Sequence, residues 1–579
     1  MKSVLSVLFV GWAAALSAAP ARLASVAFEV AELEKGAFVF ADRTFTLNDV
    51  PEALKGETFL RTTIDGTLEV VVEGAGELTI LTPVKGSFVS QSKAVSEAGF
   101  VRRTDVQAFQ LFGTSSCDVV EAWTKSVKAG ERFSFDKWCV VCGLDRSNQT
   151  YVRPASERRI AAKLLGTPNE KYAQDILINH PDYVVFIPRQ SRDPKARDDA
   201  RPGDTYNDHF QVINDNRRGL LYAFWTQASK EADVDQHIAF SKSADKGLTW
   251  TEPVIIAGSP NKRNPGLLAS WQQPMLSKSG RLYCLWNQQT TSRGPHCGQM
   301  FGAYSDDGGE TWSAPKMTPF AERMDADDRD PLVPPCWCNW QRPLRLGEGG
   351  RFFVGCSRHG KASYDDRWGC KIEFWQYENI DDNPNVEDIR IGFFAKNKDA
   401  LAAPALEGIG GFRDREPAIE EAGIVKLPDG RLFAMMRSSV GSPVWSQSRD
   451  GGRTWSRPKI LLDRDGGTPY LHSRSPCPIY DWKGPEAGSG RYFAVVHNKF
   501  DFKAKSAYQD RGPLYLIAGT FQPDAEQPIW FKAPKMFAPR PHGNSFYTSY
   551  CLVDGKGVLW FNDMKFYLLG RVIGPEWFE

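Results

Sequence analysis

Ser305-Asp-Asp307-Gly-Gly309-Glu-Thr311-Trp312 is one of three copies of the pattern Ser-x-Asp-x-Gly-x-Thr-Trp in this chain of 579 residues. The other two copies run from Ser243 to Trp250 and from Ser448 to Trp455. An Asp and a Gly two residues apart, between a strand-like run and Thr-Trp, predict a tight turn. The Asp accepts hydrogen bonds from nearby backbone amides, the Gly adopts a positive φ, and the Trp packs beneath. Three such turns in order indicate a repeated β-hairpin unit.

The repeated octapeptide resembles the Asp-box of the sialidase superfamily, whose members are β-propellers. The resemblance covers about residues 205 to 570 and implies a propeller fold for this part of the chain. Asp-boxes lie at the blade periphery and also occur in non-catalytic propellers. The motif alone therefore indicates a fold rather than an activity.

A longer repeat predicts the number of blades. Each repeat unit consists of a strand, a turn that contains Gly, and a second strand rich in aromatic and aliphatic residues. The six units are His209 to Trp225, Trp271 to Trp286, Trp340 to Cys356, Ala422 to Met436, Ser475 to Val496 and Tyr547 to Phe561. We expect an all-β protein in which residues 166–579 form a six-bladed β-propeller of the sialidase type.

The residues before the repeats predict export and an accessory domain. Residues 1–21 combine a charged start, a short apolar core and a stretch of small residues, as in a secretory signal peptide. No later stretch is apolar enough to span a bilayer, so we expect a secreted, periplasmic or cell-surface protein. Residues 22–165 alternate apolar and polar residues in short runs and predict a β-sandwich-like domain, either a packing module or a carbohydrate-attachment module.

Charge and cysteine content exclude several classes of function. The formal net charge of +1, with acidic and basic residues interspersed, gives no field for nucleic acid or a membrane surface. Cys139 and Cys142 are spaced as in redox or zinc motifs, but no second pair has zinc spacing, which favours buried thiols or a local disulfide. Another four are close enough in sequence for a loop disulfide, namely Cys336, Cys338, Cys356 and Cys370.

Polar and aromatic residues stand at the start of each predicted inner strand. Inner strands of a propeller line the central channel, so these residues are expected to meet although they are far apart in sequence. They are His209, Trp271, Gln272, Trp340, Gln341, Glu421 and Tyr547. They could form a binding pocket, or some could simply fill the channel.

The resemblance to sialidases implies roles for four residues in the second half of the chain. Sialidases have a Glu at the head of the fourth inner strand and an Arg at the end of the next strand, which match Glu421 and Arg437. Arg511 stands where the family has an Arg before a Leu-rich strand, and Tyr547-Thr-Ser-Tyr550 resembles its Tyr-Pro-Ser strand. The resemblance implies that Arg511 clamps a carboxylate and that Tyr547 is the nucleophile, with Tyr550 as the neighbouring alternative.

The physical logic of such a site is independent of the family. A sialic acid carries a carboxylate on its anomeric carbon, which converging guanidinium groups bind as bidentate, permanently charged partners. The same carboxylate repels an anionic nucleophile. A neutral phenol that loses its proton to a neighbouring Glu during attack avoids this repulsion, and sialidases are an exception to the two-carboxylate scheme of glycosidases.

A general acid must also protonate the departing oxygen. The family places an acidic residue on a loop before the first Asp-box, where this chain offers Glu231, Asp233 and Asp235. We prefer Asp233, then Glu231, because Asp235 adjoins the next strand and fits a turn. All three could also be ordinary solvated loop acids.

The first blade departs from the family pattern. Secreted sialidases usually begin this strand with an aromatic-Arg-Ile-Pro motif, whereas this chain has Asp208-His209-Phe. Either His209 replaces the missing Arg, or Arg189 or a loop residue such as Arg358 reaches the site. A His at this position leaves the sugar open, because it could bind a carboxylate or act as an acid or base on a uronic acid.

The sequence therefore predicts an exported exo-glycosidase that removes terminal sialic acid or a related acidic sugar from glycans. Arg437 and Arg511 would bind the substrate carboxylate, with His209, Gln272, Gln341 and Arg358 as further binding residues. No metal or organic cofactor is expected to take part. Two alternatives remain, a propeller polysaccharide lyase acting on uronate-containing glycans and a non-catalytic glycan-binding propeller.

Overall fold

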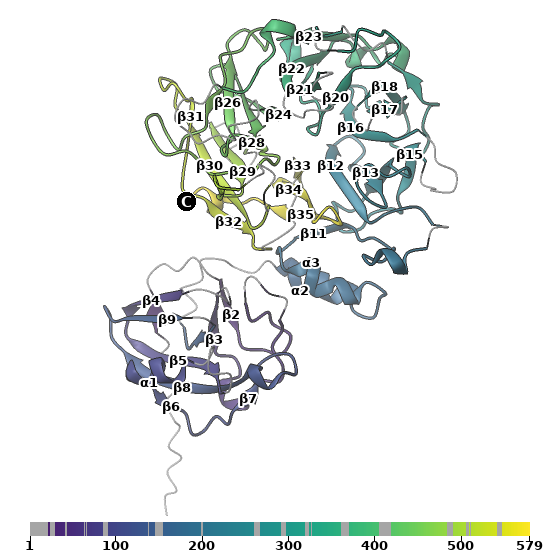
Figure 1. Ribbon diagram of the computed structural model, residues 1–579. Helices are drawn as coiled ribbons and strands as arrows, with labels where there is room; N and C mark the ends of the chain where they lie inside the picture. Colours follow the sequence, from purple (N-terminus) through teal and green to yellow (C-terminus); the bar gives the residue numbers. More distant parts are fainter. Residues whose placement is uncertain are drawn as a thin grey trace, which may run out of the picture. The chain divides into compact units, whose positions relative to one another are not determined.

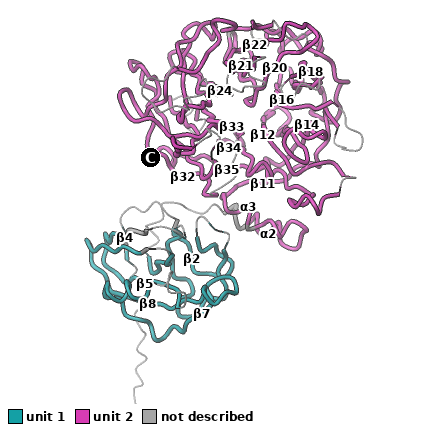
Figure 2. The backbone as a smooth tube through the Cα atoms, viewed as in Figure 1, with its two compact units in different colours: residues 1–153 teal, residues 154–579 magenta. Residues whose placement is uncertain are grey.

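A computed structural model of the chain forms two compact units, residues 1–153 and 154–579 (Figure 2). The described residues are 21–23, 29–40, 43, 45–62, 64, 67–84, 91–136, 138–144, 155–198, 201–259, 267–290, 297–318, 323–325, 327–360, 370–404, 418–482, 490–504, 509, 511–540 and 547–579. Apart from Ala21, the predicted signal peptide at residues 1–21 lies outside them. Within these ranges, no helix combines the length and the apolar character that a membrane crossing requires.

The first unit contains two antiparallel sheets. A seven-stranded sheet has the order β2-β3-β10-β5-β8-β6, with β7 also paired to β8, and a three-stranded sheet has the order β1-β4-β9. Side chains from both sheets, among them Val72, Phe135 and Ile80, share one apolar core, as in a β-sandwich. The elements are β1 (Arg22–Leu23), β2 (Glu29–Glu32), β3 (Thr58–Arg61), β4 (Thr67–Gly74), β5 (Gly76–Pro83), α1 (Ser92–Glu97), β6 (Val101–Arg102), β7 (Phe109–Gln110), β8 (Val119–Val127), β9 (Arg132–Asp136) and β10 (Val140–Cys142).

The second unit is a six-bladed β-propeller, as predicted. After α2 (Ala155–Leu164) and α3 (Ala173–Leu177), its six sheets lie around a common axis, with β12, β16, β20, β24, β28 and β33 innermost (Figure 1). Blade one contains β12 (Tyr206–Asp215), β13 (Leu220–Ala228), β14 (His237–Ser243) and β15 (Val254–Gly258); blade two contains β16 (Ala269–Leu276), β17 (Leu282–Gln289), β18 (Gly298–Ser305) and β19 (Lys316–Met317). Blade three contains β20 (Cys336–Cys338), β21 (Phe352–His359), β22 (Cys370–Tyr377) and β23 (Ile391–Phe394); blade four contains β24 (Ile419–Lys426), β25 (Leu432–Ser438), β26 (Val444–Ser448) and β27 (Lys459–Ile460).

The last two blades show how the ring closes. Blade five contains β28 (Ile479–Asp481), β29 (Arg491–Val496), β30 (Leu514–Phe521) and β31 (Ile529–Phe531), and β32 (Lys535–Ala538) also pairs with β30. Blade six takes its inner three strands from the end of the chain, β33 (Thr548–Val553), β34 (Lys556–Asp563) and β35 (Tyr567–Val572). Its outer strand is β11 (Tyr183–Phe186), which precedes blade one in the sequence and pairs antiparallel with β35. The two ends of the propeller sequence are thus joined in one sheet.

Apolar cores hold neighbouring blades together. Phe210 and Val212 of blade one pack with Trp560 of blade six, and Tyr222 of blade one packs in a cluster with Leu282 of blade two. Comparable clusters link blades two and three, three and four, and four and five. The aromatic and aliphatic residues that marked the repeat in the sequence therefore fill the spaces between blades.

The three Asp-boxes form the predicted turns between the third and fourth strands of blades one, two and four. In the second copy, Asp307 Oδ1 accepts hydrogen bonds from Ser305 Oγ at 2.7 Å and from the amide of Thr311 at 2.9 Å, and Gly309 has φ 82°. Each Trp packs on an aromatic residue of the preceding blade: Trp250 on Trp560, Trp312 on Phe240 and Trp455 on Phe374. The motif thus joins one blade to the next.

The disulfide of the structure differs from the loop disulfide that the sequence predicted. Cys336 forms a disulfide with Cys297, which lies outside the predicted group of four, because an isolated bridge places the two residues side by side. Cys338, Cys356 and Cys370 are free and buried. Cys139 and Cys142 are also buried thiols, and burial raises the pKa of Cys139 to about 12.

Candidate active site

Three inner strands share a backbone irregularity that turns one side chain towards the propeller axis. His209 in β12, Trp271 in β16 and Glu421 in β24 have φ values of 52°, 54° and 54°, and the strand register is interrupted at each position. A positive φ is uncommon for residues other than Gly, and a bulge redirects the side chain at that point. The repeated interruption brings these three residues towards one centre.

Tyr547 lies at the point where these side chains meet. Its hydroxyl donates to Glu421 Oε1 at 2.7 Å, and its ring centroid lies 4.7 Å from that of His209. The ring of Trp340 lies 6.1 Å from Tyr547, and that of Trp271 lies 5.6 Å from His209. Residues from blades one, two, three, four and six therefore meet at the head of the channel.

Arg437 joins Glu421 and Tyr547 into a triad. Its Nη1 donates to Glu421 Oε2 at 2.6 Å and to Tyr547 Oη at 3.4 Å. All three side chains are buried. Burial, followed by the charge of Glu421, raises the pKa of Tyr547 well above its ordinary value, although Arg437 opposes the shift. The phenol is therefore protonated at rest and hydrogen-bonded to a group that can accept its proton.

Glu420 and Arg474 support this triad, and the sequence interpretation missed both. Arg437 Nε lies 3.2 Å from Glu420 Oε2, and Arg474 binds both oxygens of the same carboxylate. Although burial raises the pKa of Glu420, Arg437 and Arg474 together lower it to about 2. Arg511 Nη2 donates to the carbonyl of Arg474 at 3.3 Å, which places Arg511 beside this group. The adjacent acidic pair Glu420-Glu421 was the available sequence signal.

Lys565 provides a further cation that the sequence interpretation did not include. Its Nζ lies 2.9 Å from Asp208 Oδ2 and 2.9 Å from Glu231 Oε2, and 5.7 Å from the centroid of the Tyr547 ring. Burial lowers the pKa of Lys565, but Asp208 and Glu231 outweigh burial and raise it overall. Lys565 lies in the turn between β34 and β35 of blade six, so it brings a positive charge to Asp208 of blade one.

His209 contributes a neutral ring. Burial lowers the pKa of His209, and the charge of Asp208 only partly offsets this effect. Its Nδ1 lies 3.2 Å from Thr226 Oγ1, and its carbonyl accepts a hydrogen bond from Gln272 Nε2. Gln272 is fully buried and also accepts from Thr226 at 3.0 Å, so its amide fixes the backbone and neighbours of His209.

The three loop acids have different environments. Asp235 is buried and accepts hydrogen bonds from the amide and hydroxyl of Ser229, as expected for turn chemistry. Asp233 Oδ1 accepts from the amide of Val234 at 2.9 Å. Glu231 is largely exposed and reaches the site through Lys565. The described contacts thus connect Glu231 with Tyr547 through Lys565.

Gln341, Tyr550 and Arg358 lie away from Tyr547 Oη. Gln341 accepts from the amide of Ile424 at 3.2 Å and lines, with Tyr550, a cavity of about 190 Å³ further along the channel. Arg358 is buried in ion pairs with Asp327 at 2.6 Å and Glu373 at 3.0 Å. The structure therefore does not bring the Arg358 guanidinium to the triad, because these two carboxylates bind it within blade three and its adjoining loop.

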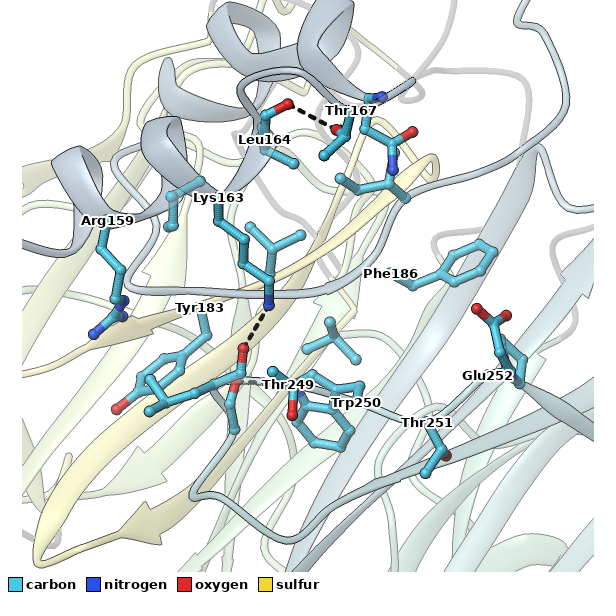
Figure 3. Close-up of a pocket in the computed structure, with 18 of the residues that line it drawn as sticks. Arg159, Lys163, Leu164, Thr167, Tyr183, Phe186, Thr249, Trp250, Thr251 and Glu252 are labelled. Carbon is cyan, nitrogen blue, oxygen red and sulfur yellow. Dashed lines mark hydrogen bonds between the residues drawn. The ribbon is translucent and has the colours of Figure 1, made fainter.

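A larger cavity, of about 600 Å³, lies at the propeller periphery (Figure 3). It is lined by α2, β11 and the first Asp-box turn, including Lys163, whose Nζ donates to the carbonyl of Leu248 at 2.7 Å. Arg189, the other substitute considered for the missing Arg, forms an ion pair with Glu252 at this cavity. Arg189 is therefore held outside the axial cluster.

Comparisons with known proteins give one family match and several similar solved structures. The curated proteins gave no match. Among solved structures, the chain is similar to the NanB sialidase from Streptococcus pneumoniae (11% identity, 96% of this chain and 93% of that chain, TM-score 0.47). It is also similar to a Hadza microbial sialidase (13%, 94% and 98%, 0.45) and to a protein of unknown function from Dyadobacter fermentans (14%, 67% and 96%, 0.44). The profile of the BNR repeat-like domain matches residues 219–554, and the chain belongs to this family.

Proposed function

We propose that the protein is an exo-glycosidase that removes terminal sialic acid or a related acidic sugar from glycans. The observation that carries the proposal is the contact of the Tyr547 hydroxyl with Glu421 Oε1 at 2.7 Å, bridged by Arg437. A buried neutral phenol beside a carboxylate is suited to attack a carbon that bears an anionic group. The proposal includes export after removal of residues 1–21.

Substrate binding would rest on local positive charge. Arg437 and Arg511 would bind the substrate carboxylate, and Lys565 would add positive charge on the opposite side of Tyr547. The net charge of the chain is only +1, so this local cluster has to provide the attraction for an anionic sugar. His209 and Trp271 would form an aromatic wall for the sugar ring.

The reaction would proceed by double displacement. Tyr547 Oη attacks the anomeric carbon and its proton passes to Glu421, while the bond to the leaving oxygen breaks. We assign Glu231, in its protonated form, as the acid that protonates this oxygen, because its contact with Lys565 brings its side chain near Tyr547. Water then attacks the anomeric carbon, Glu231 takes the water proton, and Tyr547 regains its proton from Glu421. The configuration of the sugar is retained.

The first test is release of free sugar from a panel of sialylated and uronate-capped oligosaccharides, with nuclear magnetic resonance identifying the first anomer formed. Tyr547→Phe should abolish release while the thermal midpoint changes little. Tyr550→Phe, which alters a buried tyrosine on the same strand, is the matched control and should retain activity. Unchanged sugar release by Tyr547→Phe would contradict the proposed role of Tyr547.

A polysaccharide lyase is the second candidate, and the edge-on contact between His209 and Tyr547 favours it. Such a pair could remove a proton beside a uronate carboxylate while Arg437 neutralises the acid. Elimination would then break the glycosidic bond and leave a carbon-carbon double bond. An ultraviolet-absorbing product from uronate polymers would indicate elimination, whereas glycan binding without turnover would favour a binding module.

A further inference from the structure

A group of thiol, imidazole and carboxylate donors lies in blade three, beside the proposed active site. In the register of β21 and β22, His359 is directly opposite Cys370, and Cys338 of β20 is opposite Ser357. Side chains two residues apart on a strand project from the same face. Cys338, His359 and Cys370 therefore lie on one face of this sheet.

Blade four supplies a carboxylate to the same face. The amide of Glu421 donates to Ser357 Oγ at 2.8 Å, which fixes the head of β24 against β21. Donor atoms of His359, Cys370 and Glu420 all lie within 4.8 Å of one another. Cys338 Sγ lies 3.5 Å from His359 Nε2. Within the described part of the chain, no other group of three such donors is as closely gathered.

We propose that this cluster binds one zinc ion through His359, Cys370 and Glu420, with Cys338 as the fourth donor. Thiolate and imidazole are the donors that zinc prefers, and mixed sets with a carboxylate also occur. Zinc bonds of about 2.0 to 2.3 Å in a tetrahedron separate the donors by roughly 3.3 to 3.8 Å. The separation of Cys338 and His359 already falls in this range, and the donors of His359, Cys370 and Glu420 need to approach one another by about 1.5 Å at most.

The other partners of Glu420 are compatible with a bound metal. Arg474 and Arg437 both reach Oε2 of Glu420, and Arg474 also binds Oε1. A carboxylate oxygen has two lone pairs, so Oε1 can accept the metal as a second partner. Two thiolates would offset the charge of the ion. Zinc would then tie blade three to Glu420 and fix the carboxylate that holds Arg437. This metal would position residues rather than touch the substrate.

The binding of zinc can be measured without any substrate, so its outcome is independent of the glycosidase proposal. The full chain is equilibrated with zinc, passed through a desalting column, and analysed for metal by mass spectrometry. We expect one zinc per chain. Replacement by cobalt should give a thiolate-to-cobalt charge-transfer band, which reports sulfur ligation directly and requires no variant.

Variants locate the site. Cys370→Ser and His359→Gln should each weaken zinc binding at least about tenfold. Cys284→Ser, which changes a free buried cysteine of blade two, is the matched control and should retain one zinc per chain. A Cys338–Cys370 disulfide in a non-reduced peptide map, a wild-type chain that retains no zinc, or a cobalt complex without the sulfur band would each overturn the proposal.

Discussion

The Asp-box turns and the heads of the inner strands both require residues with positive φ, but they fill these positions differently. The fifth position of each Asp-box is Gly, with φ between 82° and 92° at Gly247, Gly309 and Gly452, whereas the position before it also has a positive φ and is Lys246 in the first copy. The strand heads at the axis use His209, Trp271 and Glu421. A left-handed residue other than Gly costs roughly 1–3 kcal/mol, which persists only where the side chain is needed. The comparison separates positions that serve folding from positions that serve the site.

The largest expected effect is a loss of turnover on substitution of Glu421 at the propeller axis. Glu421→Gln keeps the shape of the side chain and an acceptor for Tyr547 but removes the proton acceptor, so sugar release should fall about 10³-fold, or roughly 4 kcal/mol in activation free energy. Steady-state kinetics and calorimetry on the same preparation measure turnover and stability separately.

The matched control for this variant is Glu373→Gln. Glu373 is an equally buried carboxylate bound to Arg358 at 3.0 Å, but it lies outside the triad. It should lower the thermal midpoint and leave turnover nearly intact. If both Gln variants lose stability alike and neither loses turnover selectively, Glu421 is a structural residue.

The second expected effect is a loss of folding stability on substitution of an Asp-box glycine at the propeller periphery. A Cβ added to Gly309 would lie 2.4 Å from Phe240 Cζ, and the residue has φ 82°. Gly309→Ala should therefore reduce the free energy of unfolding by about 3 to 4 kcal/mol through overpacking and backbone strain. Chemical denaturation measures the loss. Gly430→Ala is the control, because φ is 88° there but no atom lies within 4 Å of an added Cβ, so only the backbone strain remains.

The smallest expected effect is a change in the pH dependence of folding stability. Burial, only partly offset by the Ser475 carbonyl, lowers the pKa of His472 near the axis to about 4. Because the unfolded chain binds this proton more readily, stability is fully present above the ordinary histidine pKa and falls as the pH drops from about 6.5 to 4. His472→Gln should remove about 3 kcal/mol of this pH-dependent loss between neutral pH and pH 4.

Unfolding midpoints measured between neutral pH and pH 4 test this expectation. The carboxylate of Asp307 at the periphery has a pKa lowered chiefly by the Thr311 hydroxyl and amide, so its contribution is lost only at lower pH. Parallel pH profiles for wild type and His472→Gln across the histidine range would show that His472 is not the titrating group.

The predictable parts of the molecule were those encoded locally. Each Asp-box contains its own turn, and each repeat unit contains two adjacent strands, so the fold and the blade number could be predicted. The approach of Tyr547, Glu421 and Arg437 followed because strand heads of a propeller share an axis. The peripheral strand β11 has four residues and no repeat signal, so its partner 385 residues away was not foreseen.

The parts of the site that the sequence did not reveal depend on contacts between blades. Lys565 reaches Asp208 from a hairpin turn of another blade, and nothing near either residue in the sequence encodes this pairing. Arg474 likewise reaches Glu420 from the loop before β28. The contact of Glu231 with the site depends on Lys565 in the same way, so the sequence did not reveal it.

The pairing of β11 with β35 sets an order of events for the nascent chain. Tyr183 is opposite Gly570, so the circle of blades cannot be fastened until synthesis has passed the final hairpin. Until then, blade one keeps the flank that packs against blade six uncovered. Such a late closure prevents an incomplete set of blades from forming a closed ring.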